Sequence, residues 1–365
     1  MNWWADTVRS SGLTGLLIQS LDDHVLSPML SEVPRGPISS LFDRLFTSPN
    51  SIFSPQSAPA HEIFRLSIFT LIVTGAIFVT VSSLLLYAII RFRQRPGEAD
   101  ADREPPQIYG SNQIELAWTV IPILIIVVLF LSTVRVIFGI QQAPEPKPAL
   151  NVEVVGHQFW WEFLYPRYGV VTANELHVPV SNDPTHPMPT YLKLTTADVD
   201  HSFWVPRLAG KTDIFGGQVN TTWIQPEVTG IYLGQCAQFC GVEHARMLIR
   251  VYVQTPADFQ KWIANQQKTA VEDPNVAEGR AVFEHNACIT CHSIAGTVAN
   301  GRFGPDLTHL MSRDTIGAGT LPNTRADLEK WIKDPDAYKP ACLMPAMKLS
   351  DQDVSQIVSY LVTLH

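Results

Sequence analysis

Positive charge is scarce in this sequence. Its 365 residues include 26 lysines and arginines against 34 aspartates and glutamates, which gives a formal net charge of −8. A nucleic-acid-binding domain usually gathers basic residues on one face, so no nucleic acid is expected among the partners. The net charge excludes no other class of partner, because separate segments of the chain can face different compartments.

Cysteine is also rare, and it is unevenly distributed. All five cysteines lie from Cys236 onward. Residues 1–60 contain none, which excludes lipid attachment through cysteine in that segment. The same segment lacks the basic leader and the long apolar stretch of a secretory signal. We therefore treat residues 1–60 as an N-terminal extension of unknown role.

Charged residues are absent from two long apolar runs in the first half of the chain, residues 68–90 and 116–134. Each run is long enough to cross the hydrocarbon core of a bilayer as a helix. One such run alone can be a buried core helix. Two in tandem predict a transmembrane hairpin over residues 61–141, with spans at about 68–90 and 116–138 and membrane lipid around them. The basic segment 91–95 predicts a cytoplasmic loop, which places everything after about residue 141 outside.

Beyond residue 149 the apolar runs become short. Their richness in Val, Tyr, Trp and Thr, with turn residues between them, is typical of strands. The predicted strands are residues 150–156, 159–165, 190–196, 230–236 and 248–254. Strands this close together, without intervening helices, predict a β-sandwich or barrel over residues 149–255. Thr255 and Pro256 then favour the start of a helix, and we assign residues 256–273 to this helix and a flexible linker.

The final segment, residues 274–365, has the pattern of a small all-α domain. Val354, Ile357, Val358 and Leu361 share one face of a helix over residues 350–364. Ser350 can cap the start of this helix. Two shorter helices are predicted at residues 276–286 and 324–334.

The segment "CITCH" carries a recognisable haem-attachment pattern. Cys288 and Cys291 are three positions apart and His292 follows directly. Two thiols at this spacing can bond the two vinyl groups of one haem, and the next imidazole can then reach the iron. A zinc half-site or a thioredoxin-type pair is the alternative, but neither a second C-x-x-C nor a βαβ pattern accompanies the motif. Residues 304–307, "GPDL", can pass a loop over the proximal face.

A methionine downstream can supply the sixth ligand. The segment "LMPAMKLSD" offers Met344 and Met347. A thioether opposite histidine raises the reduction potential and suits electron transfer. Pro345 favours an extended turn at Met344, which makes Met344 the preferred ligand and Met347 the backup; either can instead be a core residue. Cys342 is interpreted as a small buried hydrophobic residue.

The segment "GQCAQFCGVEHARML" combines sulfur and imidazole ligands in one short span. Its spacing, C-x3-C-x3-H-x2-M, comprises Cys236, Cys240, His244 and Met247. Zinc accepts cysteine and histidine but rarely methionine, whereas soft sulfur ligands with imidazole and a weak thioether favour copper. A structural disulfide between the cysteines is the alternative. Two thiolates can bridge two copper ions, and the second histidine that this needs could be His157, His177, His186 or His201.

Several of these segments resemble a known family. "GHQFWWEF", "DVDHSFWVPRLAGKTDIFGG" and "GIYLGQCAQFCGVEHARM" resemble the copper-binding subunit II of haem–copper cytochrome c oxidases, and "SNQIELAWTVIP" resembles the start of its second membrane helix. This resemblance covers about residues 60–255. The C-terminal segment is similar to the cytochrome c fused to subunit II in caa-type oxidases. The resemblance implies a Greek-key cupredoxin fold with a binuclear CuA centre, and a class I cytochrome c domain.

The resemblance also implies a ligand set. His201, in "DVDHS", matches the second histidine of the family. Cys236 and Cys240 would bridge the two copper ions. His244 would ligate one copper and Met247 would be a weak ligand.

Three further positions are informative by comparison with the family. Gln238 stands where the family donates a backbone carbonyl; many relatives have glutamate there, whose carboxylate helps to hold magnesium. A neutral amide binds a hard cation more weakly, which counts against a magnesium site shared with subunit I. Phe159 stands where many relatives accept electrons through tryptophan, so we expect the tethered haem to have taken over this role; the alternative is that Phe159 is core and Trp160 serves instead. Glu115 matches a glutamate that opens a proton path, or is simply a helix-end charge.

The resemblance implies an electron-input subunit of a proton-pumping oxidase in a bacterial inner membrane. Electrons from cytochrome c or an upstream respiratory complex would pass through covalent haem c and CuA to subunit I, which reduces oxygen. The two spans contain no histidine, so the oxygen-reducing centre is not in this chain. The alternatives are the CuA subunit of a nitric oxide reductase of the same superfamily, and a membrane-anchored metal-binding module without enzymatic role.

Overall fold

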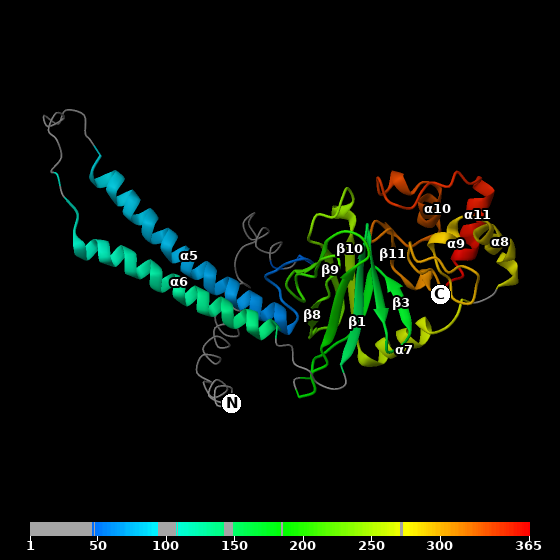
Figure 1. Cartoon of the computed structure of the whole chain (residues 1–365), viewed down its shortest axis with the longest axis horizontal. Helices are drawn as coiled ribbons and strands as arrows, with labels where there is room; N and C mark the ends of the chain where they lie inside the picture. Colours follow the sequence, from blue (N-terminus) through cyan, green and yellow to red (C-terminus); the bar gives the residue numbers. More distant parts are fainter. Residues whose placement is uncertain are drawn as a thin grey trace, which may run out of the picture.

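The chain forms three units in the order of the sequence: a helical hairpin, a β domain (residues 149–254) and a helical domain (residues 274–365) (Figure 1). This computed structural model describes residues 46, 48–93, 107, 109–141, 149–183, 185–270 and 273–365. Most of the N-terminal extension and most of the predicted cytoplasmic loop lie outside the described residues. In Figure 1 the helical domain packs against the β domain on the side away from the hairpin.

The hairpin consists of α5 (Ala58–Arg91) and α6 (Asn112–Gln141), which run side by side. Windows of mean hydropathy 2.3 and 2.8 lie along the two helices, and their apolar side chains are exposed. A bilayer around the hairpin accounts for this exposure, because apolar surface of this extent is otherwise buried. Both helices extend beyond the predicted spans because polar residues at their ends continue the same backbone hydrogen bonding.

The β domain is a sandwich of two five-stranded sheets. Their orders are β3-β2-β1-β5-β8 and β4-β10-β9-β6-β7. The strands are β1 (Leu150–His157), β2 (Trp160–Tyr165), β3 (Val170–Ala173), β4 (Glu175–Pro179), β5 (Thr190–Thr196), β6 (His201–Trp204), β7 (Thr212–Ile214), β8 (Asn220–Ile224), β9 (Gly230–Cys236) and β10 (Leu248–Gln254). All five predicted strands are confirmed, and the other five are strands of only three to five residues.

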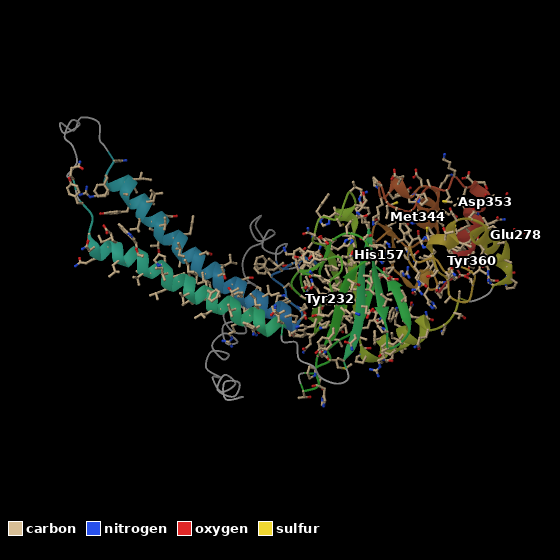
Figure 2. The ribbon with its side chains drawn as sticks, viewed as in Figure 1. His157, Tyr232, Glu278, Met344, Asp353 and Tyr360 are labelled. Atoms are coloured by element: carbon tan, nitrogen blue, oxygen red, sulfur yellow. The ribbon has the colours of Figure 1, made fainter. Side chains whose placement is uncertain are left out.

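The β domain is also tied to the base of the hairpin. The Trp223 indole N–H donates to the Ile140 carbonyl at 2.6 Å, and the Arg207 guanidinium donates to the Ser54 carbonyl at 2.9 Å. Arg207 also lies over the ring of Tyr232, 5.2 Å from its centre, on the side of the β domain nearest the hairpin (Figure 2). The two hydrogen bonds connect the hairpin, and the segment that precedes it, to the sandwich.

The helical domain follows α7 (Pro256–Gln266), whose N-cap is Thr255, as predicted. Its elements are η3 (Pro274–Val276), α8 (Ala277–His285), α9 (Cys288–Cys291), η4 (Leu310–Ser312), β11 (Thr315–Ile316), β12 (Leu321–Pro322), α10 (Arg325–Lys333), η5 (Pro335–Ala337) and α11 (Asp351–Leu361). The predicted cap of the last helix is confirmed, because Ser350 and Asp353 form a reciprocal capping box. Helices α8 and α11 pack together over the core of this domain.

His177 is buried in the β domain as part of an aromatic stack. Its ring lies 4.1 Å from that of Trp262 and 4.7 Å from that of Tyr252, measured between ring centres. The backbone of His177 exchanges two hydrogen bonds of 2.8 Å with the Tyr165 hydroxyl. Burial lowers the pKa of His177 to about 4, although a contact with Gln254 partly opposes this. His177 is therefore a neutral structural residue.

We expect the folding stability of the β domain to fall as the pH drops from about 6.5 towards 4. In this window the unfolded chain protonates His177, whose ordinary pKa is 6.5, while the folded chain does not. The contribution is fully present above pH 6.5 and is lost as the pH approaches 4, with a limit of about 3 kcal/mol. Urea unfolding of the chain between pH 7.5 and 4.5 measures this dependence. The His177→Phe variant keeps a ring without a titrating group, so an equally steep dependence in this variant contradicts the assignment.

Candidate copper and haem sites

The cysteine-rich segment lies at one end of the β domain, where β9 ends at Cys236 and a loop with η2 (His244–Arg246) returns to β10. Strand β6 pairs with β9, with Phe203 opposite Cys236, and this pairing brings His201 to the same place. Gly156 on β1 leaves room for the histidine, because a Cβ there would lie 2.7 Å from the His201 ring. Sheet pairing thus joins two segments that are far apart in sequence.

Five side chains with donor atoms form one compact cluster. The Cys236 Sγ atom lies 3.8 Å from His201 Nδ1 and 4.0 Å from Cys240 Sγ. Cys240 Sγ lies 3.7 Å from His244 Nδ1 and 3.9 Å from Met247 Sδ. Both cysteines are free, and their separation is about twice the length of a disulfide bond. Each cysteine has one histidine beside it, an arrangement that suits two thiolates shared between two metal ions.

Hydrogen bonds around the cluster orient its ligands. Asp198 Oδ1 lies 2.8 Å from His201 Nε2, which leaves Nδ1 facing Cys236. The Gln158 side chain donates to the Cys240 carbonyl, and its backbone N–H donates to Asp198, both at 2.6 Å. Partners of this kind fix the tautomer and direction of a metal-binding imidazole. The sequence contains no spacing signal for Gln158 or Asp198, although both lie within segments that carry the family resemblance.

The charges of the cluster favour a thiolate. Burial lowers the pKa of His201, but Asp198 and Cys236 outweigh it and raise the value to about 8. The neighbouring Cys240 thiol and the His201 ring hold the pKa of Cys236 well below its usual range. Cys236 in turn raises the pKa of Cys240. Soft thiolates beside imidazole and thioether are donors that copper prefers, so the residues present fit a copper centre.

The other three candidate histidines lie elsewhere. The ring of His157 is stacked on Trp160, 4.2 Å away, and His157 lies on the side of the β domain nearest the helical domain (Figure 2). His177 is in the aromatic stack, and His186 is exposed beside Asp183. The structure also places the Gln238 carbonyl 3.2 Å from Cys236 Sγ, while the Gln238 side chain is exposed.

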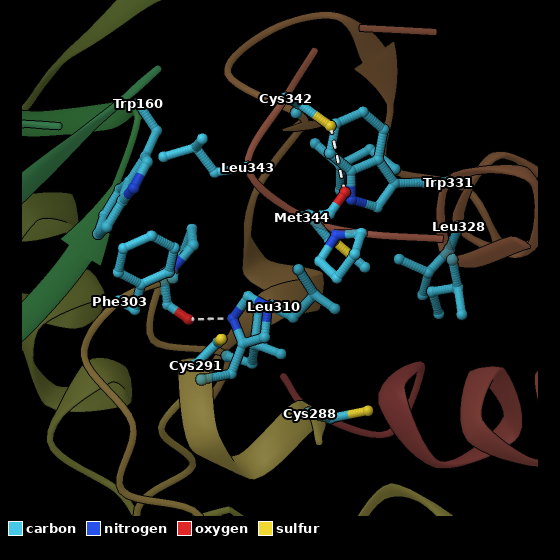
Figure 3. Close-up of a pocket in the computed structure, with 18 of the residues that line it drawn as sticks. Trp160, Cys288, Cys291, Phe303, Leu310, Leu328, Trp331, Cys342, Leu343 and Met344 are labelled. Atoms are coloured by element: carbon cyan, nitrogen blue, oxygen red, sulfur yellow. Dashed lines mark hydrogen bonds between the residues drawn. The ribbon is translucent and has the colours of Figure 1, made fainter. Parts of the chain in front are cut away.

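The second candidate site is an apolar pocket between the helical domain and the β domain (Figure 3). Cys288 and Cys291, on α9, and His292 line one side of it. The helical domain supplies most of the apolar walls, which include Phe283, Leu307, Leu310, Leu328, Ile357 and Leu361. Trp160 belongs to the β domain and faces the pocket from the side opposite Trp331 (Figure 3). An apolar slot with two thiols and an imidazole on one side fits a covalently bound haem.

The loop of residues 304–307 passes over His292, as the sequence predicts. The His292 Nδ1–H donates to the Pro305 carbonyl at 2.8 Å, which leaves Nε2 free to bind a metal. At Gly304 a Cβ would lie 2.6 Å from His292 Cε1, so only glycine allows this close approach. Burial lowers the pKa of His292, partly offset by the Pro305 carbonyl, and the ring is therefore held neutral.

Both candidate methionines line the same pocket. Met344 packs against the core of the helical domain (Figure 3). Cys342 is half-buried in the pocket wall and its thiol lies 3.5 Å from the Met344 carbonyl. Glu115 lies far from both sites, exposed in the first turn of α6, where a negative charge favours the start of a helix. Its role in proton uptake stays a prediction.

An apolar helical hairpin, a sandwich with a sulfur–imidazole cluster and a helical domain with a C-x-x-C-H pocket define a membrane-anchored electron-transfer protein. Family models match all three units: the transmembrane domain of cytochrome c oxidase subunit II at residues 49–136, its periplasmic domain at 150–254, and cytochrome c at 276–365. The chain belongs to the cytochrome c oxidase subunit II family. The predicted fold, two membrane helices followed by a cupredoxin domain and a cytochrome c domain, is confirmed.

Curated relatives agree with this assignment. Cytochrome c oxidase subunit 2 of Alkalihalophilus pseudofirmus is 33% identical over 318 residues, covering 85% of this chain and 89% of the relative. The subunit 2 of Bacillus sp. strain PS3 is 33% identical, covering 75% and 80%. A crystal structure of the periplasmic domain of subunit II from Bradyrhizobium japonicum is 28% identical and covers 34% of this chain and 96% of that one, with a TM-score of 0.31. The chain is thus a subunit of an oxidoreductase complex, and its family implies copper, haem and assembly with subunit I.

Proposed function

We propose that this chain is the electron-input subunit of a proton-pumping cytochrome c oxidase. It passes electrons from cytochrome c or an upstream respiratory complex, through covalent haem c, to a binuclear CuA centre and on to subunit I. The membrane is a bacterial inner membrane, with the β and helical domains on its periplasmic face. Residues 149–255 form the copper unit and residues 274–365 the haem unit, joined by residues 256–273.

The cluster at the end of β9 holds the copper. Cys236, Cys240, His201 and His244 would hold the two ions, and Met247 and the Gln238 carbonyl would be weaker ligands. When bound, the copper pair and the haem each supply a centre that gains and loses one electron reversibly. The surrounding β-sandwich keeps Met247 and both cysteines buried, so water is kept from the sulfur ligands.

The pocket of the helical domain holds the haem. Cys288 and Cys291 would attach the haem through thioether bonds, and His292, which is oriented by the Pro305 carbonyl, would ligate its iron. Met344 would supply the second protein ligand of the iron. Histidine together with methionine raises the reduction potential of a haem, as in electron-transfer cytochromes c.

The observation that carries this proposal is that one short segment of the β domain, residues 158–160, contacts both candidate sites. Phe159 and Trp160 line the haem pocket, and the adjacent Gln158 donates to the carbonyl of Cys240. The Phe159 ring lies beside Gly241, where a Cβ would be 3.0 Å from it. Both aromatics are covered, with exposed fractions of 6% and 8%. This burial supports the hypothesis that electrons enter through the tethered haem, because a soluble donor cannot reach either ring while the helical domain is seated.

Electron transfer within the purified full-length chain tests the proposal. A light pulse with an external photoreductant reduces the haem under anaerobic conditions, and absorption then follows both centres. We expect the haem band to return to its oxidised form as the near-infrared band of copper bleaches. A haem that stays reduced beside oxidised copper contradicts the proposed function.

A further inference from the structure

One lysine of the helical domain is buried against the β domain. Lys339 lies just after η5 (Pro335–Ala337) and is 3% exposed. Its Nζ donates to the carbonyls of Phe159 at 2.8 Å, Arg246 at 2.9 Å and Gly317 at 3.1 Å. An ammonium has three N–H donors, so each of them has an acceptor. Two of these acceptors belong to the β domain and one to the helical domain itself.

The two acceptors in the β domain flank the copper cluster. Arg246 directly precedes Met247, which packs 3.9 Å from Cys240 Sγ. Phe159 follows Gln158, whose side chain donates to the Cys240 carbonyl at 2.6 Å. A single ammonium therefore contacts two backbone segments beside the copper cluster, and one of them, at Phe159, also lines the haem pocket. Arg246 adds a hydrogen bond of 3.1 Å to the Tyr338 carbonyl, next to Lys339.

A second set of contacts lies along β4 and β10. Glu175 is 1% exposed, and its carboxylate accepts from the backbone N–H groups of Asp314 and Thr315, both at 3.0 Å, and from the Thr315 hydroxyl at 3.0 Å. The Leu248 N–H donates to the Ala318 carbonyl at 3.3 Å. Residues 314–319 are thereby held against the β domain, and Ala318 packs against Trp160.

The buried charges of Lys339 and Glu175 indicate that the helical domain has a fixed orientation on the β domain and is not merely tethered to it. Removing an ammonium or a carboxylate from water is costly, and the cost is offset only when hydrogen bonds satisfy the group in a defined geometry. A one-residue shift of residues 314–319 would move the hydrogen-bond donors of Asp314 and Thr315 away from Glu175. It would also move the Gly317 carbonyl away from the Lys339 ammonium. Apolar contacts alone would tolerate such a shift, whereas this set of directional bonds does not.

We propose that Lys339 is a positioning residue that fixes the helical domain on the β domain in one orientation, with Trp160 and Phe159 closing the haem pocket. The hydrogen bond from Lys339 to the Phe159 carbonyl holds Phe159 and the adjacent Trp160 in place in the lining of the haem pocket. The docking stands independently of the electron path, but its consequence for electron transfer rests on the proposed function.

Hydrogen exchange of the full-length chain tests the docking itself. The Lys339→Met variant keeps most of the length of the side chain and removes the ammonium. We expect the amides of residues 314–319 and of Leu248 to exchange about tenfold faster or more, with unchanged protection in α8 and α11. Lys330→Met is the matched control, since Lys330 is an exposed lysine of the same domain that pairs with Asp327. Exchange at the wild-type rate overturns the proposal. Faster exchange throughout the helical domain assigns Lys339 to the folding of that domain and also overturns it.

The light-pulse measurement gives the second readout. With absorption spectra and midpoint potentials of both centres unchanged, we expect Lys339→Met to slow haem-to-copper transfer by about tenfold or more, because the pocket is no longer held against Trp160. Transfer at the wild-type rate overturns the inference while the proposed function stands. If the wild-type chain shows no transfer at all, the proposed function fails, and hydrogen exchange still decides the role of Lys339 in docking.

Discussion

The Cys236→Ser variant is expected to lose the binuclear copper centre. Cys236 lies between His201 and Cys240, with Sγ 3.8 Å from the imidazole and 4.0 Å from the second sulfur. A serine hydroxyl is a hard ligand that stays protonated at neutral pH, so it cannot replace a bridging thiolate between soft metal ions. We expect copper affinity to fall by more than about a hundredfold, which exceeds the usual effect of removing an outer-sphere partner. Copper analysis and near-infrared absorption of the purified chain measure the loss.

The Cys342→Ser variant is the matched control for this change. Cys342 lies in the wall of the haem pocket, outside the copper cluster. The Cys342→Ser variant should leave the copper content and the near-infrared band at their wild-type values. In both variants the covalent haem should remain, since Cys288 and Cys291 are intact. A Cys236→Ser chain with full copper and an unchanged band would show that Cys236 is not a bridging ligand.

Replacing Met344 by alanine is expected to change the haem without releasing it. The thioether bonds through Cys288 and Cys291 keep the haem attached, while loss of the distal sulfur removes its absorption band and lowers the reduction potential. We expect a fall of more than about 60 mV, a tenfold change in a one-electron equilibrium. Redox titration and visible absorption of the full chain measure both effects.

Met347 provides the comparison at nearly the same place. Both methionines line the pocket, but only Met344 is packed against the core of the helical domain among the residues described. Met347→Ala should therefore keep the sulfur band and the potential. The reverse pattern, a band lost in Met347→Ala and kept in Met344→Ala, would exchange the two assignments.

Contiguous patterns made much of the fold predictable. Uncharged runs of membrane length located the two hairpin helices, and short runs rich in Val, Tyr, Trp and Thr located β1, β2, β5, β9 and β10. The predicted caps at Thr255 and Ser350 are confirmed because capping depends only on residues a few positions apart. Short strands such as β6, with four residues, contain too few positions for a periodic pattern.

The functional residues also divide into those that a short sequence motif indicates and those that only the fold brings together. Four donors of the copper cluster lie within residues 236–247, and their spacing alone indicated a metal. His201 needed the family resemblance, because only the pairing of β6 with β9 brings it to Cys236. Lys339 and Glu175 were missed altogether, since a buried charge that crosses a domain boundary looks in sequence like an ordinary surface residue.

The segment that connects the β domain to the helical domain also makes contacts that could not be predicted from the sequence. The part of residues 256–273 that follows α7 was predicted to be a flexible linker, yet the described residues of this part make several hydrogen bonds. Gln267 donates to the Tyr168 carbonyl at 2.9 Å, and the Lys268 carbonyl lies 2.9 Å from His309 Nε2. Ala270 donates to the Ala295 carbonyl at 3.2 Å. The partners of these residues are distant in sequence, so composition could not indicate the contacts.

Metal and haem analysis of the purified full-length chain, with visible and near-infrared absorption, tests whether the chain holds both redox centres. We expect two copper ions for each covalent haem, together with the near-infrared band of a mixed-valence copper pair. Haem without copper would contradict this expectation. Cys236 and Cys240 would then be a candidate disulfide, and the chain would be a membrane-anchored cytochrome c.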